Sequence, residues 1–157
     1  MSNIKTLLQE ETLQQVELEP VVKVQRSESI RSTIQKINQH SVRAAVIVEK
    51  GKPIGSLTQR DILLKIALKK VDLDQPVETV MTPPPQETLT LQSTLEEAIG
   101  LIMRHQRTDL PIVDKSGKTL NVMTSRALVN HIAAHFPKVV YNLPPNPKQT
   151  SHSLDGG

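Results

Sequence analysis

The feature that most constrains the fold is an internal repeat with an offset of about 65 residues. When the sequence is shifted by that amount, apolar residues, prolines and histidines of one half fall on similar residues of the other. After one inserted residue, Ser116, the offset becomes 66 and the match continues. We therefore predict two copies of one unit, rather than two unrelated segments of one α/β fold. The matching pairs are Pro20 and Pro85, Ile30 and Leu95, Ile37 and Ile102, His40 and His105, Gly51 and Gly117, Thr58 and Thr124, and Arg60 and Arg126.

Each copy is predicted to contain elements in the order β-α-β-β-α. Short runs rich in β-branched residues indicate strands, and apolar residues at helical spacing indicate helices. The segment Ser93-Thr94-Leu95-Glu96 predicts a capping box, with a hydroxyl and a carboxylate three residues apart. The predicted ranges are Val21–Gln25, Ser29–His40, Ala44–Glu49, Ile54–Leu57 and Gln59–Lys70 in the first copy, and Glu87–Leu91, Ser93–His105, Leu110–Asp114, Leu120–Met123 and Ser125–Phe136 in the second.

The predicted organisation has four parts: a lead segment at 1–17, the first copy at 18–72, the second at 78–137 and a tail at 138–157. The lead segment has the apolar residues for one short helix and carries no motif. Three consecutive prolines, Pro83-Pro84-Pro85, predict an extended connection with few hydrogen bonds. The tail is polar and rich in proline, so it is expected to be extended or disordered.

Composition excludes several classes of protein. The chain has no Cys, which rules out a disulfide scaffold, a thiol nucleophile and a cysteine zinc site. Its one Phe, one Tyr and absence of Trp count against a ring-stacking nucleic-acid platform, and its net charge of +3 is too small for a phosphate-tracking groove. No apolar run is long enough to span a membrane, no signal peptide is evident, and Ser2 excludes N-myristoylation. We therefore expect a cytoplasmic protein without nucleic-acid or membrane partners.

The end of the first copy carries a motif that resembles a known family. Segment 51–61, Gly-Lys-Pro-Ile-Gly-Ser-Leu-Thr-Gln-Arg-Asp, joins a strand to a helix through Thr-x-Arg-Asp and resembles the end of a CBS domain (the cystathionine β-synthase domain). Segment 43–48 is similar to the preceding core strand of that family. In the second copy, segments 80–83 and 110–114 resemble the opening of the domain and its middle strand. The resemblance covers residues 18–137.

The resemblance implies an α+β fold in which tandem CBS repeats pack through their sheets with pseudo-twofold symmetry, and in which the pair forms a homodimer. It further implies a sensor that binds an adenosine-containing ligand (AMP, ADP, ATP or S-adenosylmethionine) between the repeats and regulates an unidentified effector protein. No enzyme activity and no required cofactor are expected. The alternative, a dimerisation or docking module without a ligand, stays open.

Thr58 and Asp61 are the leading candidates for a ligand site. They stand three residues apart where a strand enters a helix, so a hydroxyl and a carboxylate share one turn and suit the two neighbouring hydroxyls of a ribose. Gly55 would let a ligand approach the backbone. By the resemblance, Thr58 and Asp61 form a ribose clamp and Ala45 lines an adenine slot. The alternative is a helix cap, and both roles are compatible if Asp61 keeps spare lone pairs.

The second copy departs from this pattern. Thr124 repeats the threonine, but Ala127 stands where the clamp carboxylate should be. By the resemblance, Arg43 faces that broken clamp, whereas the phosphate side of the intact clamp has Asp109, which would repel a phosphate. The nearby cationic side chains that could compensate are Arg60, Arg104, His105 and Arg107. We therefore predict binding mainly through adenosine, with little dependence on phosphate number. Since aromatic residues are so few, adenine would lie against aliphatic side chains with modest affinity.

His131 and His135 stand four residues apart on the last predicted helix, a spacing that can hold a metal ion. No third ligand lies nearby in the sequence, so no metal site is predicted. Glycine-rich phosphate loops and nucleophile elbows are also absent from the sequence.

Overall fold

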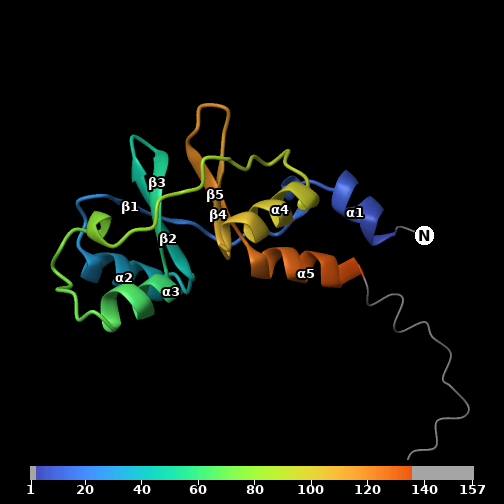
Figure 1. Cartoon of the computed structure of the whole chain (residues 1–157). Helices are drawn as coiled ribbons and strands as arrows, with labels where there is room; N and C mark the ends of the chain where they lie inside the picture. Colours follow the sequence, from blue (N-terminus) through green and yellow to red (C-terminus); the bar gives the residue numbers. More distant parts are fainter. Residues whose placement is uncertain (1–2, 136–157) are drawn as a thin grey trace, which may run out of the picture.

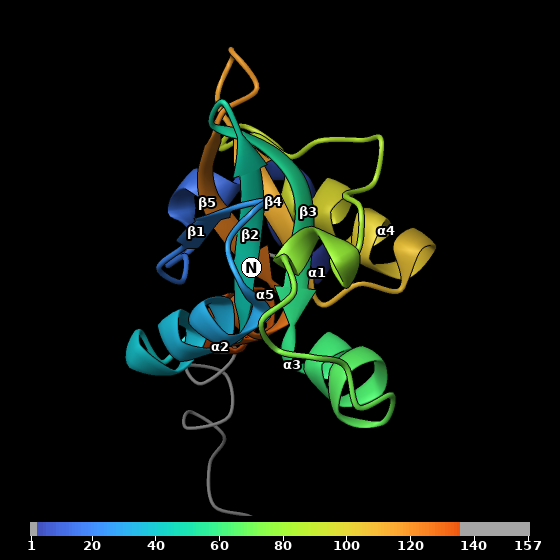
Figure 2. The ribbon, with the colours of Figure 1, turned by 90° about the vertical axis from the view of Figure 1, so that its left-hand side faces the viewer.

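The computed structural model describes residues 3–135, and the predicted tail at 138–157 lies outside the described residues. Figure 1 shows two units side by side, with their sheets in the middle and their helices at the two ends. Figure 2, turned by 90°, shows the sheets of the two units overlapping face to face. This arrangement confirms the predicted α+β fold of two repeats packed through their sheets. Within residues 3–135, none of the helices has the length and apolar character needed to cross a membrane.

The first repeat contains a three-stranded sheet in the order β1-β2-β3. β1 is parallel to β2, and β2 is antiparallel to β3 through a hairpin in which Lys50 and Gly51 have positive φ. A glycine is suited to this turn because it adopts the left-handed region without a steric penalty. The elements are β1 (Val22–Gln25), α2 (Ile30–Gln39), β2 (Ala44–Glu49), β3 (Lys52–Thr58) and α3 (Gln59–Asp61), which continues as a π-helical segment over Ile62–Ala67.

The second repeat has the same plan with a smaller sheet. Its elements are α4 (Leu95–His105), β4 (Asp109–Val113), β5 (Thr119–Thr124) and α5 (Ser125–His135). Both hairpins contain a register shift at equivalent places, between Ile47 and Val48 in one repeat and between Ile112 and Val113 in the other. The internal repeat of the sequence is therefore reproduced down to the irregularities of the strands.

Each repeat has its own apolar core. In the first, buried residues such as Ile37, Ile47 and Leu57 pack between the sheet and its helices. In the second, buried residues such as Leu95 and Ile112 do the same, together with apolar residues of the lead segment. A separate small cluster joins the sheets, and its buried members are Val46, Val48 and Val122.

The segment ahead of the first helix of each repeat pairs with the last strand of the other repeat. In the second repeat this segment, called the linker below, contains Thr82, which exchanges two backbone hydrogen bonds with Ser56 of β3. In the first repeat Glu19 forms the equivalent bridge to Val122 of β5. Val122 is the counterpart of Ser56 at the offset of 66. The two repeats thus exchange their leading segments reciprocally.

The lead segment begins with α1 (Ile4–Glu10), which confirms the expected short helix, and continues as a 3-10 turn over Leu13–Gln15. It packs on the second repeat: α1 lies beside α4 (Figure 1), and the Leu95 amide donates to the Glu11 carbonyl. In the same way, the segment after the first repeat lies along α2, where the Ile30 amide donates to Gln75.

Three local predictions need correction. Segment Glu87–Leu91 forms only a single bridge, Leu89 to Ile112, instead of a strand. The capping box of α4 lies one residue later than predicted, with Thr94 as the cap and Glu97 as its partner, because the Ser93 hydroxyl instead accepts from the amide of Thr90. The helix expected to reach Lys70 changes to π geometry after its first turn, and its regular part ends at Ala67.

Candidate ligand-binding clefts

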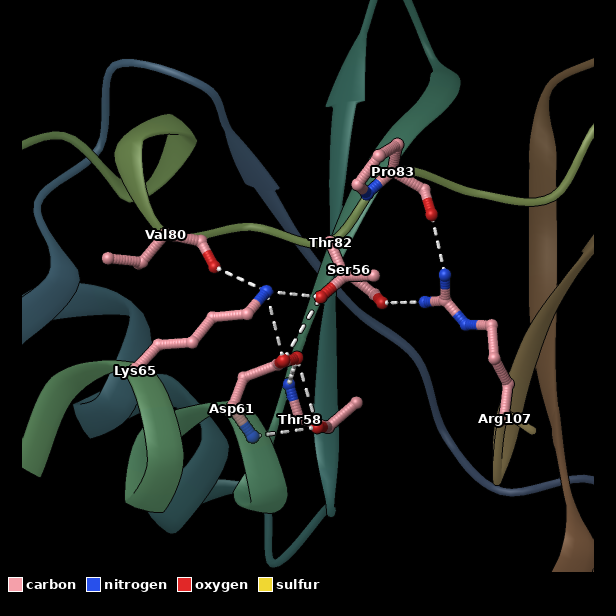
Figure 3. A network of polar contacts seen from close by, with 8 residues as sticks. All are labelled: Ser56, Thr58, Asp61, Lys65, Val80, Thr82, Pro83 and Arg107. Carbon is pink, nitrogen blue, oxygen red and sulfur yellow. Dashed lines mark hydrogen bonds and ion pairs between the residues drawn. The ribbon is translucent and has the colours of Figure 1, made fainter. Parts of the chain in front are cut away.

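The predicted clamp of the first repeat lies where β3 ends and α3 begins (Figure 3). The Thr58 hydroxyl accepts from the Asp61 amide at 3.1 Å, and the Thr58 amide donates to Asp61 Oδ2 at 3.0 Å. These two bonds are a complete capping box, so the helix-cap role considered for this pair is present in the structure. The Thr58 hydroxyl also donates to Asp61 Oδ2 at 3.0 Å.

The other carboxylate oxygen of Asp61 is held by two further residues. Thr82, in the linker between the repeats, donates its hydroxyl to Oδ1 at 3.0 Å, and Lys65 Nζ lies 3.1 Å from the same oxygen. Lys65 also donates to the Val80 carbonyl at 3.2 Å and to the Thr82 hydroxyl. Figure 3 shows that Asp61, Lys65 and Thr82 converge, so the clamp is fastened to the linker.

This network changes the expectation for Asp61. Four donors surround its two oxygens, and a carboxylate has about four lone-pair sites. The expectation that Asp61 keeps spare lone pairs is therefore wrong for this conformation. Burial opposes ionisation of the side chain, but hydrogen bonds from the Thr58 backbone, Lys65 and Thr82 outweigh it and hold the pKa of Asp61 below its ordinary value. The carboxylate is charged at neutral pH.

A cleft of about 420 Å³ opens beside this clamp. One wall is formed by Thr58, Arg60 and Asp61, and the other by the segment from His105 to Asp109, with the prolines 83–85 along the rim. Arg107 is held in place because its guanidinium donates to the Ser56 hydroxyl and to the Pro83 carbonyl, both at 2.5 Å (Figure 3). The cleft therefore lies between the repeats and draws residues from both of them.

Asp109 behaves differently from the expected surface carboxylate. Its side chain is buried, with only 5% of the residue exposed. Burial raises the pKa of Asp109, the charge of Arg107 offsets part of this effect, and the charge of Asp61 adds to it. Asp109 is therefore a buried carboxyl group beside the charge of Arg107.

The second cleft, of about 640 Å³, lies at the pseudo-symmetric position. It is lined by Arg126 and Ala127 of α5, by Arg43 and by the segment from Glu17 to Pro20. Thr124 retains the capping role, since its hydroxyl accepts from the Ala127 amide at 3.1 Å. Ala127 supplies no carboxylate, as the sequence indicated.

A smaller cavity of about 230 Å³ lies between the two clefts and is lined by both cap threonines. Arg60 lines this cavity and the first cleft, whereas Arg43 lines it and the second cleft. Arg43 therefore lies on the side of the broken clamp.

Two predicted site residues lie away from the clefts. Gly55 is buried, and a Cβ at this position would come within 2.5 Å of the Met81 sulfur, so the glycine is needed for contact with the linker rather than with a ligand. Ala45 is completely buried in the core of the first repeat. Its neighbour Ala44 lines the central cavity instead, because successive side chains of a strand point to opposite faces.

Two residues of the site, Lys65 and Thr82, were not predicted to act there. Lys65 stands four residues after Asp61, and this spacing is the usual signal for an ion pair on a helix. Thr82 and the linkage of Arg107 to Ser56 depend on contacts between distant parts of the chain. Their local sequence carries no signal for these contacts.

Comparison with known proteins identifies the class to which this arrangement belongs. The CBS domain profile matches residues 13–68 and 77–134, one match for each repeat. The CBS domain-containing protein YhcV of Bacillus subtilis is 33% identical over 115 residues, which cover 72% of this chain and 80% of YhcV. The chain belongs to the CBS domain family and contains two copies of the domain. It spans 48% or less of the length of several other curated relatives that it matches.

Solved structures share the fold. A CBS domain protein of Pyrobaculum aerophilum, PAE2072, determined as a complex with AMP, has a TM-score of 0.67 at 21% identity, with 79% of this chain and 99% of that chain covered. The CBS domain pair of protein MJ0100, determined with 5′-methylthioadenosine and S-adenosyl-L-methionine, has a TM-score of 0.69 at 18% identity, with 80% and 98% covered. At these identities the similarity establishes the arrangement of the two repeats.

Proposed function

We propose that this chain is a regulatory module that binds an adenosine-containing ligand in the first cleft and modulates an effector protein, without chemistry of its own. The observation that carries the proposal is the ionised Asp61 beside Thr58 at the mouth of a cleft between two CBS repeats. Two proteins of the same fold were solved with adenosine compounds, namely AMP, 5′-methylthioadenosine and S-adenosylmethionine. The same ligand class is proposed here.

Ligand binding at this clamp requires a local exchange of hydrogen bonds. Because the Asp61 oxygens already have four donors, a ribose can bind only by replacing one or more of them. The Thr82 hydroxyl is the donor most easily replaced, since a ribose hydroxyl is the same chemical group. Release of Thr82 would loosen the linker between the repeats. This exchange offers a physical route from ligand binding to a change in the surface presented to an effector.

Phosphate is proposed to contribute little to affinity. Arg107 is already bonded to Ser56 and Pro83, and Arg43 lines the second cleft rather than the first. Arg60 is exposed and is the arginine of the clamp motif that lines the first cleft. Because no Phe, Tyr or Trp occurs within residues 3–135, adenine would contact aliphatic side chains and backbone there.

Calorimetric titration with adenosine, AMP and ATP tests the proposal. We expect the three dissociation constants to lie within about tenfold, or about 1.4 kcal/mol, of one another. Asp61→Ala should abolish binding, whereas Thr124→Val, a change at the cap of the second cleft, should leave it intact. ATP binding a hundredfold tighter than adenosine, about 2.7 kcal/mol, would contradict the minor role of phosphate. Binding that survives Asp61→Ala in a folded protein would contradict the clamp.

A second proposal is that the pair forms a homodimer through the helices that follow the two caps. Leu63, Leu64 and Leu68 after the first cap are 64%, 47% and 73% exposed, and Val129 of α5 is 62% exposed. Leu63 and Val129 are equivalent at the offset of 66, so the two repeats present apolar side chains at matching places. Exposed apolar groups gathered in this way favour association with another surface.

Sedimentation of the full chain measures the proposed association. A dimer that dissociates in the double variant Leu63→Glu and Val129→Glu supports this surface. If the chain is a monomer at all concentrations and calorimetry also detects no binding of an adenosine ligand, both proposals are overturned. A dimer without any adenosine binding would favour the ligand-free docking module.

A further inference from the structure

The fold brings a third potential ligand to the histidine pair of α5. Glu11 is the C-cap residue of α1 and stands 120 residues before His131, and its carboxylate lies against both imidazole rings. Glu11 Oε2 is 2.5 Å from His131 Nε2, and Glu11 Oε1 is 3.3 Å from His135 Nε2. One ligand atom of each residue lies within 4.8 Å of those of the other two. The absence of a metal site, predicted because no third ligand is near in the sequence, therefore has to be reconsidered.

The hydrogen bonds around His135 favour a cation at this place. His135 Nδ1 lies 2.9 Å from the His131 carbonyl, which can only accept, so Nδ1 must carry a hydrogen. In the neutral ring Nε2 then has a lone pair, and this lone pair faces a carboxylate oxygen. Two acceptors face one another favourably only when a proton or a metal ion lies between them. A backbone carbonyl that fixes the distal nitrogen is also the usual support of a metal-binding histidine.

The ligand set is suited to a borderline transition-metal ion. Two imidazole nitrogens and one carboxylate form a known zinc-binding set that leaves a fourth position open, whereas Mg²⁺ and Ca²⁺ prefer oxygen ligands. Tetrahedral zinc with bonds of about 2.0–2.2 Å places its ligand atoms about 3.4 Å apart. Glu11 Oε1 and His135 Nε2 are already 3.3 Å apart, and the other carboxylate oxygen, Oε2, must move away from His131 Nε2 by roughly 1 Å. The flexible Glu11 side chain can supply that movement.

The three residues are also positioned and partly shielded by the fold. Both backbone groups of Glu11 are hydrogen-bonded, since its amide donates to the Leu7 carbonyl and its carbonyl accepts from the Leu95 amide. The side chains of His131 and Glu11 are 14% and 24% exposed, and that of His135 is 37% exposed, which leaves access for an ion from solvent. His131 also lines the second cleft. We propose that Glu11, His131 and His135 bind one zinc-class divalent ion, which fastens the lead segment to α5 at the edge of the second cleft.

Titration of the full chain with ZnCl₂ after chelator treatment tests this site. We expect one ion per chain, and a loss of affinity of at least about 100-fold in His135→Ala and in Glu11→Gln, because even indirect partners of metal ligands contribute 10–100-fold. His131 is more buried, so His131→Gln serves as a third variant, with circular dichroism to confirm folding. His105→Ala is the matched control, since His105 pairs with Glu87 at 2.8 Å and no third ligand adjoins this pair within residues 3–135. Zinc affinity in this control should stay unchanged.

Several outcomes would overturn the site. One is a zinc dissociation constant of the wild-type chain above about 100 µM, which corresponds to a binding free energy weaker than about 5.5 kcal/mol. Another is zinc affinity that is unchanged in His135→Ala or Glu11→Gln. The third is a loss of zinc affinity in His105→Ala as large as in those variants. Asp61→Ala should leave the zinc isotherm unchanged. Failure of the zinc site and failure of the adenosine site are therefore observed separately.

Discussion

The two clefts occupy equivalent places, yet they use their equivalent residues differently. In the first, Asp61 joins its cap threonine to Lys65 and, through Thr82, to the linker. In the second, Ala127 takes the place of the carboxylate, and His131, the counterpart of Lys65, turns to Glu11 in the lead segment. Each repeat therefore fastens the segment that runs past it, one through an aspartate of its own helix and the other through a glutamate of that segment. Equivalent segments are thus held at both clefts by different chemical groups.

The largest expected effect concerns the close approach of the linker to β3. Gly55→Ala should destabilise the protein by about 1–3 kcal/mol, because the added Cβ overlaps the Met81 side chain. At the equivalent position of the second repeat, Asn121→Ala should change stability by no more than about 0.5 kcal/mol. Urea denaturation of both variants measures the contrast. An equal loss of stability in Gly55→Ala and Asn121→Ala would show that the two repeats do not differ in how closely the leading segment approaches the last strand.

The helix-capping role of Asp61 should be visible in the stability of the protein. Asp61→Ala should cost about 1–2 kcal/mol at pH 7, because it removes a capping box and leaves Lys65 unpaired. The pKa of Asp61 is lower in the folded state than in the unfolded state, so this contribution is present above the unfolded pKa and is lost as the pH falls through the folded pKa. The difference in the free energy of unfolding between Asp61→Ala and the wild type should therefore become smaller below about pH 4.

Denaturation curves between pH 7 and pH 3 follow this change. The control is Asp74→Ala, which removes an ion pair with Arg31 on the surface, where the aspartate side chain is 72% exposed. Exposed pairs contribute little, so its effect should be below about 0.5 kcal/mol. A difference for Asp61→Ala that stays constant with pH would contradict the assigned role of the carboxylate.

A smaller effect is expected when the competing donor is removed. Thr82→Val keeps the shape of the side chain but deletes the hydroxyl that donates to Asp61. Adenosine should then bind about three- to tenfold more tightly, by up to about 1.4 kcal/mol, while the free protein loses a little stability. Calorimetry measures the affinity, and Thr119→Val, which deletes a buried hydroxyl without a partner in the described part of the chain, is the control. Unchanged or weaker binding would argue against displacement of Thr82.

The smallest effect is expected at Asp109, whose counterpart in the first repeat is Ala44. Burial raises the pKa of Asp109 above its unfolded value, so the ionised carboxylate destabilises the fold above the folded pKa, and this penalty fades as the pH falls through it. Asp109→Asn should raise the melting temperature at pH 7 by at most about 2 °C, with a smaller gain at acidic pH. Thermal melts at both pH values provide the measurement, and a lowered melting temperature at pH 7 would contradict the assignment.

The sequence alone was sufficient to predict the repeat, the order of most elements and the family, because these depend on periodic apolar residues and on a local motif. The sequence could not show that Glu87–Leu91 forms no strand. This segment makes only one bridge, from Leu89 to Ile112, and the number of bridges at the edge of a sheet depends on tertiary contacts. Ala45 and Gly55 were assigned to the site because a motif does not reveal which face of a strand a residue occupies. Glu11 was missed because only the fold brings the lead segment to α5.

The reciprocal pairing of the leading segments has a consequence for how the chain folds and comes apart. One of the contacts that close this arrangement is the bridge between Glu19 and Val122, which are 103 positions apart in the chain. Such long loops must close before these contacts contribute, so folding should be slow for a chain of this size. Neither repeat can unfold without exposing an edge of the other. The pair should therefore unfold in one cooperative transition, although each half has a core of its own.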